Sequence, residues 1–153
     1  MALERHLQGK SALLTLFDDL YIFDKDGVLL IDWPLKAGRR NLDMSGRDYI
    51  QRVHNNRQPF ISEPILGKAS GQPIIVIAAP VLNPAGELVA IIGGVLNLYK
   101  PNLLGTLGNP KNGETGYFYL VSQSRMVIAH PLRERIMQPA ASVQDNTPLA
   151  RAF

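Results

Sequence analysis

Residues 70–81 read Ser-Gly-Gln-Pro-Ile-Ile-Val-Ile-Ala-Ala-Pro-Val, and this stretch decides the fold of the chain. Its apolar block has no strict alternation, which is typical of a strand covered on both faces. A second apolar block, Leu-Val-Ala-Ile-Ile-Gly-Gly-Val-Leu, occupies residues 88–96. The linker between them, Asn-Pro-Ala-Gly-Glu at residues 83–87, is a turn sequence. The two blocks therefore predict a long antiparallel hairpin, in which each fully buried aliphatic side chain contributes roughly 1.5–3 kcal/mol.

Length and composition restrict the classes of function. A chain of 153 residues, 46% of them hydrophobic, fits one domain, or one module with part of another. A net charge of +3, spread without a basic run, argues against nucleic-acid binding. The absence of cysteine excludes disulfides, thiolate catalysis and Cys-type zinc sites. No apolar run reaches the length of about 18 residues typical of a membrane span, and no signal peptide is evident, so we expect a piece of a longer protein.

The N-terminal half predicts a helix followed by a hairpin. A leucine-rich stripe from Leu3 to Leu20 approximates helical spacing, and we expect a long N-terminal helix there. Strand-like segments at residues 20–23 and 28–32 flank Asp24-Lys25-Asp26-Gly27, a hairpin turn signal. The same D-x-D-G pattern also invites a calcium interpretation, but it is too short for the twelve-residue loop, so we favour the turn and expect no metal.

Further along the chain, shorter elements flank the central hairpin. Ser45 is expected to cap a helix over residues 46–54, and residues 60–66 predict an edge strand because they contain Pro64. A short helix is expected between Leu98 and Gly108, then a hairpin of residues 116–121 and 126–130. This late hairpin echoes the one at residues 20–32, which suggests two similar modules in tandem. The tail, residues 132–153, is weakly patterned, and we expect partial disorder there.

Enzymatic motifs are absent from the sequence. It has no G-x-S-x-G elbow, phosphate-binding loop, H-E-x-x-H or dinucleotide glycine pattern. His6, His54 and His130 lie far apart in sequence, so no spacing supports a shared site. A hydrolase whose site forms only in three dimensions is a distant alternative, which a histidine near Ser62 and an acid would revive.

The better candidate site surrounds the short helix. If this helix covers the sheet, Arg47 and Tyr49 can face the space between them, where the planar guanidinium fork suits a carboxylate. Each hydrogen bond to a charged group is worth roughly 1.5–3 kcal/mol. The alternative is that Arg47 pairs with Asp43 or Asp48 at the surface and that Tyr49 belongs to the core. The residues alone leave both interpretations open.

In order and spacing, several segments together resemble the double Cache sensor domains of bacterial membrane receptors. The match covers about residues 12–135. Within the family, it is closer to the sensor domains of diguanylate cyclases or histidine kinases than to those of chemoreceptors. The segments that carry it are residues 21–29 (YIFDKDGVL), 46–49 (GRDY), 61–64 (ISEP), 70–73 (SGQP), 79–81 (APV), 86–89 (GELV), 93–94 (GG), 115–120 (TGYFYL) and 129–131 (AHP).

The resemblance implies an α+β fold of two PAS-like modules, of which the membrane-distal one has a central five-stranded antiparallel sheet. It divides the chain into a helix at residues 1–20, a membrane-distal module at 21–100, a linker at 101–113 and a partial proximal module at 114–153. The family binds small molecules between sheet and helix in the distal module. The implied ligand-binding residues are Arg47, Asp48, Tyr49, Ser62, Trp33, Val76 and Ala78.

The sequence departs from the family's amino-acid-binding pattern at three positions. Ile50 replaces an aromatic residue, Ile65 replaces a tyrosine, and Gly113 stands where the amine-binding aspartate is expected. A carboxylate without an ammonium group, or no ligand, therefore fits better than an amino acid.

Two functions follow from these observations. The first is a periplasmic, non-catalytic sensor of a membrane-anchored receptor, which needs no cofactor and passes ligand binding to a cytoplasmic output. The second is a structural or dimerisation module without a ligand. A homodimer through the N-terminal helix is compatible with either function.

Overall fold

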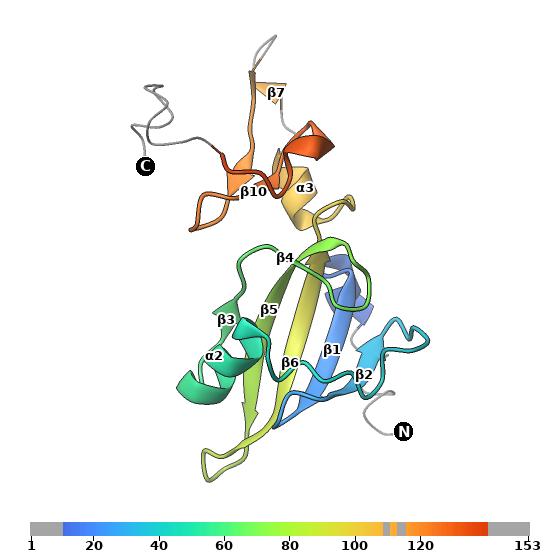
Figure 1. Ribbon diagram of the computed structural model, residues 1–153, viewed down its shortest axis with the longest axis vertical. Helices are drawn as coiled ribbons and strands as arrows, with labels where there is room; N and C mark the ends of the chain where they lie inside the picture. The colour runs from blue at the N-terminus through green and yellow to red at the C-terminus, as the bar shows by residue number, and fades with distance from the viewer. Residues whose placement is uncertain (1–10, 109–110, 113–115, 141–153) are drawn as a thin grey trace. The chain divides into compact units, whose positions relative to one another are not determined.

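The computed structural model describes residues 11–108, 111–112 and 116–140 (Figure 1). The chain divides into two compact units, residues 1–97 and residues 98–153. The division falls directly after the second apolar block of the central hairpin. The candidate site predicted around the short helix therefore belongs to the first unit.

The first unit is built on one antiparallel sheet. The strand order is β2-β1-β6-β5-β3, and β4 also pairs with β5. The predicted edge strand is interrupted, so the sheet has six strands rather than the expected five. The break falls at residues 62–64, which include Pro64, a residue that cannot donate to the ladder. The strands are β1 (Asp19–Asp24), β2 (Leu29–Trp33), β3 (Phe60–Ile61), β4 (Ile65–Leu66), β5 (Pro73–Leu82) and β6 (Leu88–Asn97).

The long hairpin predicted from the two apolar blocks is confirmed. Strands β5 and β6 pair along their whole length, with Ile77 opposite Gly94. The turn is closed by Asn83, whose side-chain Oδ1 accepts hydrogen bonds from the backbone N–H groups of Ala85 and Glu87 at 3.0 and 2.9 Å. The earlier hairpin is confirmed too, because β1 pairs with β2 across the turn at residues 24–27.

One face of the sheet is covered by α2 (Asp48–Asn56), which lies across β5 and β3 (Figure 1). The helix buries Tyr49, Ile50 and Val53, which follow helical spacing. Its N-cap is Arg47 and not Ser45 as expected. The Ser45 N–H donates instead to the Asp43 carboxylate at 2.8 Å, which makes a turn before the helix.

We expected a long N-terminal helix up to Leu20, and this prediction is wrong for its second half. Residues Ser11–Thr15 form a short 3-10 helix, and β1 already begins at Asp19. The chain joins the sheet there because the Asp18 N–H donates to the Val95 carbonyl at 2.8 Å. The first half of the expected helix lies outside the described residues.

The segment from Pro34 to Arg47, which we call the strap, is tied to the edge of the sheet. The Leu29 N–H donates to the Leu42 carbonyl, and the Met44 N–H donates to the Gly27 carbonyl. Gly27 has φ +92°, and a Cβ there would lie 2.8 Å from Cγ2 of Ile50. A glycine is therefore needed where the hairpin turn passes beneath α2.

A buried ionic cluster also holds the strap. Its Arg39 is 7% exposed and donates from Nη1 to the Asp19 carboxylate at 3.2 Å and to the Tyr21 hydroxyl at 2.9 Å. The Asp32 carboxylate lies 3.8 Å from the same nitrogen, and its other oxygen, Oδ1, is buried without a hydrogen-bond partner among the described residues. These charges connect the strap to β1 and β2.

The second unit consists of short elements. The predicted late hairpin is confirmed in its inner part, since β9 pairs with β10, whereas β8 pairs with β7. The predicted helix begins at Leu103 rather than Leu98, and residues 141–153 of the tail lie outside the described residues. The elements are α3 (Leu103–Gly108), β7 (Lys111–Asn112), β8 (Gly116–Tyr117), β9 (Leu120–Val121), β10 (Val127–Ala129) and a 3-10 turn (Arg133–Arg135).

Among the described residues, no helix combines the length and the apolar character that crossing a membrane requires.

Candidate functional site

A pocket of about 220 Å³ lies at the N-terminal end of α2, beside β3 and β4. Its volume corresponds to roughly seven water molecules at about 30 Å³ each, which suits a small metabolite. It collects four of the seven residues named from the sequence. The lining residues are Gly46, Arg47, Asp48, Tyr49, Ser62, Glu63 and Ile65.

Arg47 is half-buried at this pocket, and within the described part of the chain its guanidinium makes no hydrogen bond or ion pair. The alternative pairing with Asp43 or Asp48 is not found. Asp48 accepts from Nε of Arg52 at 3.1 Å, and the Asp43 carboxylate accepts the Ser45 N–H. A half-buried guanidinium without a partner is poised to bind an anion.

Tyr49 combines the core role and the pocket role that the sequence left open. The residue is 3% exposed, and its ring packs 6.3 Å from that of Phe23. Burial raises the pKa of Tyr49 to about 12, against the opposing effect of the nearby Arg47 charge. The phenol is therefore neutral at physiological pH, with a hydroxyl that can donate to a ligand.

Ser62 lines the pocket but also stabilises the sheet edge. Its Oγ accepts the Val76 N–H at 2.9 Å, and its own N–H donates to the Val76 carbonyl at 2.8 Å. Within the described part of the first unit, no histidine contacts Ser62, since His54 contacts Asn55 instead. The condition that would revive a hydrolase is therefore not met by these residues.

The remaining sequence-derived candidates lie away from the pocket lining. Val76 and Ala78 are fully buried in the core cluster that includes Tyr49. Trp33 pairs with Leu20, one position beyond the Tyr21–Asp32 pair. Because side chains alternate along a strand, this register places Trp33 on the face opposite α2.

Sequence reasoning missed a cationic side chain near the pocket. Lys68 and Arg47 both line an adjoining, more open pocket of about 350 Å³. Lys68 donates from Nζ to the Asp43 carbonyl at 2.7 Å, so it is held against the strap. Only the fold brings these residues together, since 21 positions (68 minus 47) separate them. Gly113, the expected aspartate position, lies outside the described residues.

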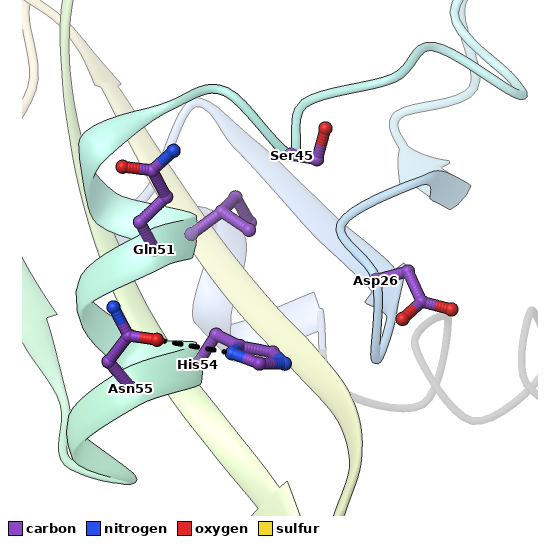
Figure 2. A pocket seen from close by; sticks show the side chains of 6 residues that line it. Asp26, Ser45, Gln51, His54 and Asn55 are labelled. Atoms are coloured by element: carbon purple, nitrogen blue, oxygen red, sulfur yellow. Dashed lines mark hydrogen bonds between the residues drawn. The ribbon is translucent and has the colours of Figure 1, made fainter.

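A third pocket, of about 200 Å³, lies on the other side of α2 (Figure 2). Gln51, His54 and Asn55 project from the helix, while Asp26 comes from the β1–β2 turn and Ser45 from the strap. His54 Nδ1 lies 3.3 Å from Oδ1 of Asn55. Within the described ranges, no group of three or more His, Cys, Asp or Glu side chains is placed to hold a metal ion.

Comparison with known families gives a match that covers nearly the whole chain. The Cache domain model dCache_1 matches residues 2–151. The chain belongs to the Cache domain family. The antiparallel sheet and the covering helix are thus those of a Cache domain.

The relatives of this Cache domain that we found are chemoreceptors. The methyl-accepting chemotaxis protein PctB of Pseudomonas aeruginosa is 25% identical over 147 residues, 95% of this chain and 22% of PctB. The ligand-binding domain of the Pseudomonas fluorescens chemoreceptor CtaA, solved with L-isoleucine, is 28% identical with a TM-score of 0.65. The alignment covers 84% of this chain and 51% of the CtaA chain, so this Cache domain spans about half of that structure.

The PctB ligand-binding domain, solved in complex with L-Gln, has a TM-score of 0.65 over 84% of this chain and 51% of the PctB chain. Its sequence identity is 23%, so this likeness supports the fold alone. The expected likeness to diguanylate cyclase or histidine kinase sensors rather than chemoreceptors finds no support among these relatives. The solved relatives are ligand-binding domains of chemoreceptors.

Proposed function

We propose that this Cache domain is the extracytoplasmic ligand-sensing part of a bacterial receptor and binds a small carboxylate between α2 and the β3–β4 edge. The observation that carries the proposal is the guanidinium of Arg47, which has no partner among the described residues and lies at a pocket of about 220 Å³. The neutral phenol of Tyr49 lines the same space. A guanidinium fork and a hydroxyl donor together suit a carboxylate.

Amino acids are the first carboxylates to test. CtaA is solved with L-isoleucine and, at the same 28% identity, with L-serine. The pocket has groups of both signs, since Asp48 and Glu63 line it with Arg47. A zwitterion can pair its carboxylate with the guanidinium and its ammonium with a carboxylate of the lining.

Signalling follows from closure of the strap and α2 onto the sheet. A ligand held by Arg47 and Tyr49 stabilises the closed arrangement only to the extent that it binds the closed arrangement more tightly than the open one. Coupling of this kind is typically worth about 1–3 kcal/mol. In the full-length protein, anchored in the membrane, that shift biases a cytoplasmic output; the chemoreceptor relatives favour a chemotaxis output.

The first experiment measures L-valine binding to the 153-residue chain by isothermal titration calorimetry. Isovalerate lacks only the ammonium group and isobutylamine lacks only the carboxylate, so the two analogues separate the two charges. We expect L-valine and isovalerate to bind and isobutylamine not to bind. Arg47→Gln should weaken binding by about tenfold or more, because a hydrogen bond to a charged group is lost.

The matched control is Arg57→Gln, which removes the same charge at the other end of α2, outside the pocket lining, from a side chain that donates to the His54 carbonyl rather than to a lining residue. Its affinity should match that of the unmodified chain. Equal loss in both variants, or binding that survives Arg47→Gln, contradicts the proposed site. If no carboxylate binds, the structural or dimerisation module is the better account.

A further inference from the structure

The second unit holds a separate pocket of about 350 Å³, large enough for a small organic molecule. It is formed by the late strands and by the 3-10 turn that follows them. Its lining residues are Tyr117, Tyr119, Val127, His130, Arg135 and Ala140. None of them belongs to the site proposed above.

Three aromatic rings form walls of this pocket. The Tyr117 and His130 rings lie 5.0 Å apart at an interplanar angle of 73°, and the Tyr119 ring lies 5.6 Å from His130 at 55°. The two tyrosine rings are 6.4 Å apart and inclined at 50°. Rings inclined in this way present both faces and edges to a flat ligand. Each aromatic pair formed with the ligand contributes roughly 0.5–1.5 kcal/mol of binding free energy beyond the burial of its surface.

The polar groups of the pocket are hydrogen-bond donors. Nδ1 of His130 accepts the Leu132 N–H at 2.9 Å, so the neutral ring carries its proton on Nε2 and can donate from there. Arg135 is exposed, and its guanidinium has no hydrogen bond or ion pair within the described part of the chain. Among the described residues, none of those that line the pocket carries a carboxylate. Aromatic rings alone also attract cations. Here the positive charge of Arg135, with no acid among the described lining residues, repels a cation.

We propose that the second unit carries its own ligand site, formed by Tyr117, Tyr119, His130 and Arg135, which takes a planar carboxylate such as an aromatic acid. The rings contact the flat body of the ligand, and Arg135 pairs with its carboxylate. The chain then has two sites of different selectivity: a small pocket beside Arg47 and a flat-walled pocket beside Arg135.

Benzoate is the probe for this site, and cyclohexanecarboxylate, benzyl alcohol and choline are its comparators. Cyclohexanecarboxylate keeps the charge without the flat ring, and benzyl alcohol keeps the ring without the charge. Choline carries a cation in place of the anion. Saturation-transfer NMR and calorimetry on the 153-residue chain should show benzoate binding more tightly than all three. Arg135→Gln should weaken benzoate binding by about tenfold or more, since a charge-assisted contact is lost.

The matched variants assign the site. Arg133→Gln removes the same charge two residues away, outside the pocket lining, and Arg47→Gln removes it from the first unit; both should leave benzoate affinity unchanged. His130→Asn keeps an acceptor for the Leu132 N–H but loses the ring, and should weaken benzoate without unfolding the chain, as checked by circular dichroism.

The two sites are distinguishable because Arg135→Gln should not change L-valine binding. The second site is overturned if benzoate does not bind, if Arg47→Gln rather than Arg135→Gln abolishes its binding, or if choline binds more tightly than benzoate. Failure of both L-valine and isovalerate to bind would leave the benzoate result intact and would refute only the first site.

Discussion

At the scale of single residues, the buried ionic cluster around Arg39 was not predictable from the sequence. Arg39 stands in a basic stretch with Lys36 and Arg40, which predicts an exposed loop because charged side chains usually lie at the surface. The fold instead buries it between Asp19 and Asp32, which lie 20 and 7 positions away. Arg47 was predictable, because its place at the start of an amphipathic helix follows from local spacing.

The ionic cluster gives the residue-scale prediction. Arg39→Met should lower the free energy of unfolding by about 3–5 kcal/mol, because it leaves the buried Asp32 carboxylate without its cation and Asp19 paired with Lys36 alone. Lys36→Met is the control: Lys36 also pairs with Asp19, at 2.7 Å, but its side chain is 41% exposed, so the cost should stay below about 1 kcal/mol. Urea denaturation measures both variants. Equal destabilisation by the two would contradict the buried role of Arg39.

At the scale of elements, the strands were more predictable than the helices. The apolar blocks and turn residues of β5–β6 and β1–β2 act locally, so the sequence located both hairpins. The N-terminal helix was predicted past its actual end because Phe17 and Leu20 fit a helical stripe. Phe17 instead packs against Gly94 of β6, a contact between residues 77 positions apart that no local pattern reveals.

This contact gives the element-scale prediction. A Cβ at Gly94 would lie 2.5 Å from the Phe17 ring, whereas a Cβ at the neighbouring Gly93 would meet Phe23 at 3.3 Å. Gly94→Ala should therefore destabilise the protein by about 1–3 kcal/mol through overpacking, and Gly93→Ala by less. Thermal unfolding compares the two, and adding Phe17→Leu to Gly94→Ala should recover part of the loss. Gly93→Ala being the more harmful change would contradict the packing of Phe17 on this strand.

At the scale of the whole molecule, the two buried tyrosines make the stability of the fold depend on alkaline pH. Burial is the largest cause that raises the pKa of Tyr21 and of Tyr49 to about 12, from ordinary values near 10. The folded state therefore holds these protons more tightly than the unfolded chain. Their stabilising contribution is complete below pH 10 and is lost as the pH rises from about 10 to about 12.

Each tyrosine contributes on the order of 2 kcal/mol to this loss, since one pKa unit corresponds to about 1.4 kcal/mol. Urea midpoints of the 153-residue chain should fall between pH 10 and pH 12. Tyr49→Phe removes one titrating group and keeps its ring against Phe23, so its midpoint should fall less over the same range. A fall of equal size in both proteins would show that ionisation of Tyr49 is not opposed by folding, and would contradict burial as the cause of the raised pKa of Tyr49.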